Sequence, residues 1–215
     1  MGIITISRKT GSLGTLVGQT VAKKLGMKCV GKDFIADIMN EYGFSKFNEI
    51  YSATPSIWDT YDELRVNTLN FMVKTIEAIG AHGDIVLVGR GGFEIFEDFS
   101  DVLNVRTNAP LEVRVKRKQE QNGISESEAI KRVKAHDKAR KAFLKSELRH
   151  GYNNTQNFDL VINTGIVDVE SASDVIANAY KNLMERGRNS TSKSLEDLKI
   201  DPVLQKLIDD KIKEL

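Results

Sequence analysis

Residues 3–15 read IITISRKTGSLGT, and this stretch decides the fold. Its first part, residues 3–7, is a β-branched run that predicts a buried strand. The rest contains Gly11 and Gly14 and leads into a helical apolar pattern that ends at Gly26. A strand, a glycine-containing loop and a helix in this order are typical of a phosphate-binding site. The first amides of a helix are unpaired, and glycine lets them approach an anion closely.

The loop departs from the usual phosphate-loop pattern, G-x-x-x-x-G-K-[ST]. Laid after the strand, that pattern requires glycine at Arg8 and at Leu13, and lysine at Gly14; only Thr15 satisfies it. Two interpretations therefore stay open: a phosphate-binding loop without its lysine, or a strand-to-helix turn with two incidental glycines. On the first interpretation, the residues that bind the phosphates of ATP are Gly11, Ser12, Gly14 and Thr15.

Composition limits the class of protein. The chain has 215 residues, of which 40% are hydrophobic and 28% charged, as in one ordinary globular domain. A formal net charge of +1 gives no overall attraction to nucleic acid or to a membrane surface. Cys29 is the only cysteine, which excludes an intramolecular disulfide and fits a reducing cytoplasm. No apolar run approaches the roughly 20 residues that cross a bilayer. We therefore expect a cytoplasmic protein with neither nucleic acid nor membrane as a partner.

Short apolar runs alternate with helical patterns along most of the chain. The runs at 84–88 and 159–163 are nearly continuous, as expected of strands buried on both faces of a parallel sheet. This alternation predicts an α/β fold, a five-stranded parallel sheet flanked by helices. The predicted strands are residues 3–7, 27–30, 84–88, 102–106 and 159–163.

Three segments stand apart from the strand–helix alternation of residues 1–188. Residues from about 33 to 80 contain helical patterns and no strand, and those from about 117 to 157 form a basic helical excursion. Both follow carboxyl ends of strands, where open α/β sheets bind ligands, so we interpret them as an acceptor-binding insertion and a lid. Residues 189–215 read as a linker and a C-terminal amphipathic helix.

The C-terminal helix is predicted from Asp201-Pro202, a good N-cap followed by a proline suited to the first helical position. An apolar stripe runs from Val203 to Leu215. Such a stripe is expected to dock on its own domain or on a partner subunit. A homo-oligomer formed through this helix therefore stays an alternative.

Four further motifs follow the opening stretch in order. Taken together, they resemble the cytidylate kinase-like family, a divergent branch of the P-loop nucleoside monophosphate kinases whose loops also lack the ordinary lysine. The resemblance covers roughly residues 3–180. It implies Mg²⁺-dependent transfer of the γ-phosphoryl group of ATP to a nucleoside monophosphate, CMP or dCMP by analogy. The motifs are residues 85–92, residues 109–112 with Arg114 and Arg117, residues 137–140, and residues 157–164.

The resemblance also implies roles for particular residues. Asp33 and Arg90 match positions that contact the acceptor nucleotide, although an N-cap role would equally explain Asp33. An arginine suits a phosphate because its planar guanidinium can bond two oxygens. Arginines of the lid would close over the triphosphate and neutralise the transferring group, with Asp137 as their organiser. The alternative for these cations is a solvated helix face. The arginines expected in the lid are Arg114, Arg117 and Arg140.

Departures from the family pattern shape the predicted catalysis. Arg8 or Lys9 is the candidate to replace the charge of the missing lysine, and Thr15 is the candidate Mg²⁺ ligand. Val88 stands where ordinary cytidylate kinases have aspartate, which leaves Glu94 or Asp37 as substitute carboxylates. Two other functions therefore stay open: a non-catalytic nucleotide-binding protein that retains the kinase fold, and a kinase of another small metabolite.

Overall fold

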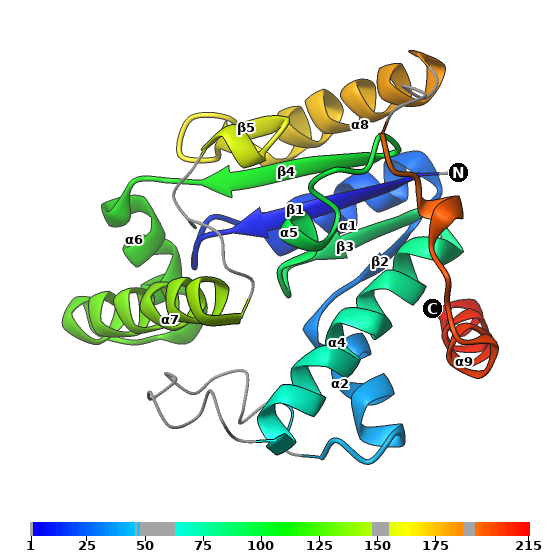
Figure 1. Ribbon diagram of the computed structural model, residues 1–215. Coiled ribbons are helices and arrows are strands. Elements are labelled where there is room, and N and C mark those ends of the chain that lie inside the picture. The colour runs from blue at the N-terminus through cyan, green and yellow to red at the C-terminus, as the bar shows by residue number, and fades with distance from the viewer. Residues whose placement is uncertain (1, 46, 48–62, 148–154, 187–191) are drawn as a thin grey trace.

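The computed structural model describes residues 2–45, 47, 63–147, 155–186 and 192–215. Its centre is a parallel five-stranded sheet in the order β2-β3-β1-β4-β5, as the predicted fold class requires (Figure 1). Each strand lies close to its predicted position. The strands are β1 (Ile3–Arg8), β2 (Lys28–Val30), β3 (Ile85–Val88), β4 (Val102–Asn108) and β5 (Leu160–Asn163).

Helices cover both faces of the sheet (Figure 1). On one face α1 (Gly14–Leu25) and α8 (Val169–Arg186) bury the side chains of Ile4 and Ile6. On the other face Ile3 packs in a larger apolar cluster with residues of α2, α4, α5 and α9. These elements are α2 (Lys32–Glu41), α4 (Glu63–His82), α5 (Gly92–Ile95) and α9 (Pro202–Lys213).

The strand order places the glycine loop at the centre of the carboxyl edge. The central strand β1 pairs with β3 on one side and β4 on the other. The chain nevertheless leaves β1 for β2, two positions away, so a crevice opens where the strand order reverses. The basic excursion supplies α6 (Leu111–Asn122) and α7 (Glu126–Glu147), which lie beyond this edge of the sheet (Figure 1).

Local signals set the ends of the helices much as the sequence predicts. Gly26 ends α1 with φ of 69°. Asp168 begins α8 by accepting a hydrogen bond from the Ser171 amide at 2.7 Å. Asp201 caps α9 through the amides of residues 203 and 204. Asp33 is not an N-cap, because Gly31 holds that position of α2.

The structure corrects the expectation that residues 159–163 are buried on both faces. β5 is an edge strand that pairs with β4 alone. Val161 is consequently 46% exposed. By contrast, every residue of β3 is buried, as predicted for 84–88. A continuous apolar run therefore did not distinguish an edge strand from a central one.

Parts of the insertion, the lid and the linker lie outside the described residues, namely 48–62, 148–154 and 187–191. The middle of the apolar stripe of the C-terminal helix is buried within the chain, through Leu204, Ile208 and Ile212. This part of the stripe docks on its own domain. Val203 and Leu215, at the two ends of the stripe, are exposed, and the homo-oligomer stays a prediction. Among the described residues, no helix has the length and apolar character to span a membrane.

A buried polar pair between the two central strands gives a test of this fold. Thr5 donates a hydrogen bond of 2.5 Å to the Asn104 side chain, and both residues are buried. Thr5→Val removes that donor and should lower the free energy of unfolding by about 1–3 kcal/mol. Thr75→Val is the control, because the equally buried Thr75 hydroxyl bonds only to Phe71 of its own helix and to the Met39 sulfur. Urea denaturation should show the larger loss in Thr5→Val; equal losses would contradict the assignment.

Candidate functional site

The loop between β1 and α1 turns sharply and lines a cleft at the carboxyl edge of the sheet. Gly11 has φ of 83° and Leu13 has φ of 57°, so both adopt the left-handed conformation that favours glycine. A Cβ atom on Gly11 would lie 2.7 Å from the Arg114 carbonyl oxygen. The amide of Val17 bonds to the Leu13 carbonyl at 2.9 Å and begins the regular helix. The amides before it form an open helix N-terminus that favours an anion.

Ser12 holds the loop in shape. Its side chain is fully buried, and its hydroxyl lies 2.8 Å from the Lys9 carbonyl and 3.0 Å from the Thr107 hydroxyl. The Thr164 hydroxyl in turn donates to the Ser12 carbonyl at 3.0 Å. The Ser12 hydroxyl therefore points into the protein, and Ser12 is not among the residues that line the cleft.

Arg8 occupies the space in which the missing lysine would begin. A Cβ atom on Gly14 would lie 2.6 Å from the Arg8 Cβ and 2.6 Å from the Thr107 hydroxyl oxygen. The Arg8 guanidinium lies over Gly89, where an added Cβ would overlap it. Glycine at positions 14 and 89 thus makes room for the Arg8 side chain, which reaches across the carboxyl ends of β1 and β3.

Arg90 lies on a turn with an unusual backbone. Gly89, Arg90 and Gly91 have φ values of 86°, 54° and 77° in succession. This left-handed run costs conformational energy at Arg90, and such strain is common at ligand-binding sites. The Arg90 side chain is 6% exposed, and its guanidinium lies 4.9 Å from the centre of the Phe47 ring.

Three arginines meet at a small pocket beside the loop. Arg8, Arg90 and Arg140 line it together with Ser7, and its volume is about 20 Å³. Such a volume holds one water-sized group among polar partners. Three guanidinium groups around so small a space create a local field that favours an oxyanion.

The arginines of α6 and α7 hold the loop by its carbonyl oxygens. Arg114 donates to the Thr10 carbonyl at 3.1 Å, and Arg117 donates to that of Gly11 at 3.3 Å. Arg140 donates to the carbonyl of Arg8 at 3.1 Å. Each contact fixes a carbonyl on the outer side of the loop.

Asp137 joins these contacts to the loop backbone. One carboxylate oxygen accepts the Thr10 amide at 3.0 Å, and the other pairs with Arg114 at 2.7 Å. Arg114 is only 5% exposed. Neither residue lines the cleft, whereas Arg117 and Arg140 do. The predicted lid arginines thus divide into one that is buried behind the loop and two that line the cleft.

The cleft itself is open, with a volume of about 1370 Å³. Its cationic side chains outnumber its carboxylates, which come from Asp33 and Glu120. Asp33 is exposed at the start of α2 and lines the cleft. The predicted site residues that line it are Arg8, Lys9, Gly11, Gly14, Thr15, Asp33, Arg90, Arg117 and Arg140.

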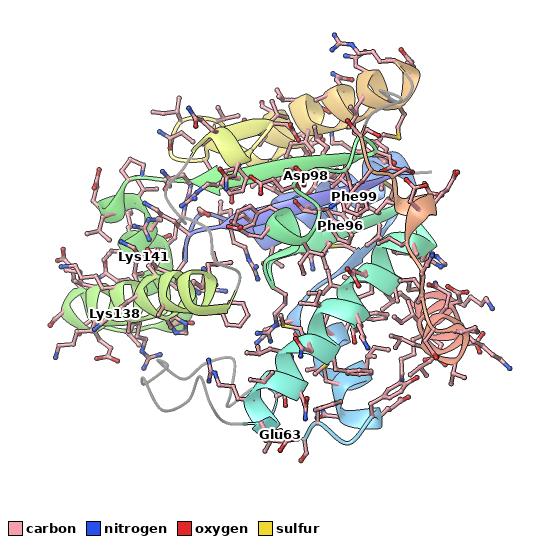
Figure 2. All side chains as sticks on the ribbon, in the orientation of Figure 1. Glu63, Phe96, Asp98, Phe99, Lys138 and Lys141 are labelled. Atoms are coloured by element: carbon pink, nitrogen blue, oxygen red, sulfur yellow. The ribbon has the colours of Figure 1, made fainter. Side chains whose placement is uncertain are left out.

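Sequence reasoning passed over some residues that share this surface. Lys32, Gln19 and Gln121 also line the cleft. Of these, only Lys32 could have been found from the sequence, because it stands next to Asp33. His136, an exposed residue of α7, lines it too. Lys138 and Lys141 on α7 are exposed and are not among the cleft residues (Figure 2).

Electrostatics in the cleft suit a polyanion. The pKa of Lys9 is lowered, first by burial and then by the positive charges of Arg114 and Arg106. The pKa of His136 is lowered by burial and by Arg140 and Lys118. Burial is the larger cause in both cases, and neighbouring positive charges, which a bound phosphate would offset, add to it.

The cleft offers few oxygen ligands for a metal ion. The described residues contain no cluster of three or more His, Cys, Asp or Glu that could hold one. The Thr15 hydroxyl and the Asp33 carboxylate line the cleft, whereas Glu94 and Asp37 do not. Mg²⁺ is usually bound by one or two protein oxygens together with substrate phosphates and water. These residues therefore fit an ion that arrives with a nucleotide.

The model of the cytidylate kinase-like family matches residues 3–166, and the chain belongs to this family. A cytidylate kinase of Ignicoccus hospitalis is 26% identical over 181 residues, which cover 82% of this chain and 97% of that protein. Family membership supports a kinase-like function and implies, in general terms, ATP and a divalent metal ion.

Solved structures agree on the fold. An uncharacterized protein from Eubacterium ventriosum superposes with a TM-score of 0.66 and 24% identity, covering 84% of this chain and 98% of that one. A gluconokinase from Sinorhizobium meliloti superposes with a TM-score of 0.50 and 15% identity, covering 87% and 98%. These proteins therefore share the arrangement of the sheet and its helices with this chain.

The ion pair behind the loop gives a direct test of the site. Asp137→Asn leaves Arg114 buried without its counter-charge, so we expect a loss of about 2–4 kcal/mol in the free energy of unfolding. Glu128→Gln on the same helix is the control. Its partner is Arg132 at 2.8 Å, and both side chains are close to half exposed. Removing that charge should cost under about 1 kcal/mol. Similar losses in the two variants, measured by urea denaturation, would contradict this role of Asp137.

Proposed function

We propose that this protein transfers the γ-phosphoryl group of ATP to a nucleoside monophosphate, with CMP or dCMP as the acceptor. The observation that carries the proposal is the convergence of Arg8, Arg90 and Arg140 on one small pocket beside the glycine loop. Phosphoryl transfer needs positioning and charge neutralisation more than covalent chemistry. A pocket with three guanidinium groups supplies that neutralisation.

In this proposal the two nucleotides share the cleft. The glycine loop and the start of α1 bind the β- and γ-phosphates of ATP through backbone amides, with Arg8 and Lys9 in place of the missing lysine. Asp33 and Arg90 hold the acceptor. An oxygen of the acceptor phosphate forms a bond to the γ-phosphorus while the bond to the β-phosphate oxygen breaks, which yields ADP and a nucleoside diphosphate. Arg117 and Arg140 stabilise the charge on the transferring group.

The supporting residues keep the loop ready for this task. Arg114 and Asp137 act as positioning residues, because they hold the Thr10 carbonyl and amide and do not line the cleft. A bound Mg²⁺ would neutralise the phosphates, with the Thr15 hydroxyl as its protein ligand. The choice of acceptor rests on relatives such as the cytidylate kinase of Ignicoccus hospitalis.

One observation favours a non-catalytic nucleotide-binding protein as the second candidate. Val88 replaces the aspartate of ordinary cytidylate kinases, and it is buried against α1, where a Cβ on Gly18 would lie 2.7 Å from it. No carboxylate side chain therefore enters the cleft from that position. ATP would bind in both cases, and only a kinase would release ADP in response to an acceptor.

ADP release with ATP, Mg²⁺ and a panel of nucleoside and small-metabolite acceptors separates these functions. We expect stimulation by CMP or dCMP. Arg90→Ala should lower kcat/KM for the acceptor by about 100-fold, because a charge-assisted contact to the phosphate is lost. Arg132→Ala, exposed and outside the cleft, is the control and should change little. Absence of acceptor-stimulated ADP from the wild type would refute the monophosphate-kinase function. Unchanged kinetics in Arg90→Ala would remove that residue from the site.

The cation that replaces the lysine is tested by ATP affinity. Arg8→Ala or Lys9→Ala should weaken ATP binding about ten-fold or more in a calorimetric titration, since each removes a charged donor. Lys138→Ala is the exposed control. Gly14→Lys restores the missing lysine to the motif, yet it should weaken binding, because its Cβ would meet the Arg8 Cβ. If neither Arg8→Ala nor Lys9→Ala reduces the affinity for ATP, or if Gly14→Lys increases it, the proposal that Arg8 and Lys9 replace the missing lysine is wrong.

A further inference from the structure

The C-terminal tail crosses the amino edge of the sheet and is anchored there by Asp101. The tail comes from α8 on one face of the sheet and ends in α9 on the other (Figure 1). The Asp101 carboxylate is buried and accepts the Ser194 hydroxyl at 2.7 Å and the Leu195 amide at 3.1 Å. The Ser100 amide donates to the Lys193 carbonyl at 2.9 Å. The tail is therefore bonded to the start of β4 before α9 begins.

The anchored segment also enters the core. Leu195 is 4% exposed and lies beside Gly80 of α4, where an added Cβ would be 3.2 Å from its Cδ2 atom. The same Cβ would be 2.6 Å from the ring of Phe96, which lies with Phe99 near the crossing tail (Figure 2). The end of α4 is consequently held between Phe96 and the tail.

Helix α9 then contacts the last residues of α2 and α4, two helices of the insertion segment. Its side chains Ile208 and Ile212 are buried in the cluster that contains α4. Lys211 pairs with Glu41, the last residue of α2, at 2.5 Å. Asp209 lies 2.8 Å from His82, the last residue of α4. One helix thus contacts α4 through apolar side chains and through His82, and contacts α2 through the ion pair with Glu41.

The attachment of α9 affects the cleft through α2. The helix runs from Lys32 to Glu41, and Asp33 lines the cleft from its first turn. Ten helical residues span only about 15 Å as one rigid rod. A displacement of the Glu41 end would therefore move Asp33 relative to the glycine loop.

We propose that residues 192–215 form an internal strap that fixes α2 and α4 against the sheet and so holds the acceptor side of the cleft in register with the glycine loop. The family match ends at residue 166, so the strap lies outside it. The kinetic consequence rests on the proposed kinase function, whereas the restraint on α2 and α4 does not.

Hydrogen exchange in the full chain tests the restraint. Ile208→Ala loosens α9 from α4, and Lys211→Met removes the contact with α2. Ile176→Ala is the control, because Ile176 is also fully buried but lies on α8, on the opposite face of the sheet. We expect Ile208→Ala to speed amide exchange in α2 and α4 about ten-fold relative to α8, and Ile176→Ala to leave α2 and α4 unchanged relative to α6. Equal effects of the two variants on α2 and α4 would overturn the strap.

Steady-state kinetics distinguish a role of the strap in positioning the acceptor side of the cleft from an effect on the stability of the protein alone. Lys211→Met and Ile208→Ala should raise KM for the acceptor about three- to ten-fold and leave KM for ATP and kcat within about two-fold. Ile176→Ala should leave both KM values unchanged. A rise in both KM values, or in neither, would overturn the positioning role. Absence of turnover in the wild type would count against the proposed function instead. The acceptor's dissociation constant, measured by calorimetric titration, would then replace KM in the same comparison.

Discussion

Guanidinium groups from α6 and α7 hold the carbonyl oxygens of the glycine loop, and the arrangement of the site depends on this restraint. Arg114, Arg117 and Arg140 each bond one of these carbonyls, and Asp137 fixes the Thr10 amide beside them. With its carbonyls held on one side, the loop presents the start of α1 to the cleft. Preorganised donors of this kind require little rearrangement when an anion binds.

The same restraint changes the interpretation of the α6–α7 segment, which the sequence predicted to be a lid. The base of the α6–α7 segment is bonded to the loop, so these helices form one wall of the cleft together with it. The opposite wall is built from α2, whose far end is held by α9 through Glu41 and Lys211. Both walls are thus attached to the sheet, one through the loop carbonyls and one through the tail. If the cleft changes shape when a ligand binds, one of these two attachments has to break or shift.

Much of the fold was predictable because strands and helices leave periodic apolar patterns. The strands, the glycine end of α1 and the capped start of α9 all follow from local residue types. The edge position of β5 did not, because an apolar run records which residues pack and not how many neighbouring strands there are. In the site, Arg90 and Asp33, which the resemblance matched to acceptor-contacting positions, both line the cleft. The resemblance grouped Arg114 with Arg117 and Arg140, but only the latter two line the cleft, and Arg114 is buried behind the loop.

Residues 3–15 are enough to predict the strand, the glycine loop and the helix, and they show that the motif's lysine position is occupied by Gly14. The tertiary contacts show that Arg8 fills the space at Gly14, that Asp137 bonds the loop backbone, and that the middle of the C-terminal stripe packs on its own domain. Such contacts could not be predicted, because they join residues that are far apart along the chain. Thr10 and Arg114, which are 104 residues apart, meet only because β1 and β4 lie side by side. Spacing in the sequence shows which residues share a face of a helix, but packing alone decides what that face contacts.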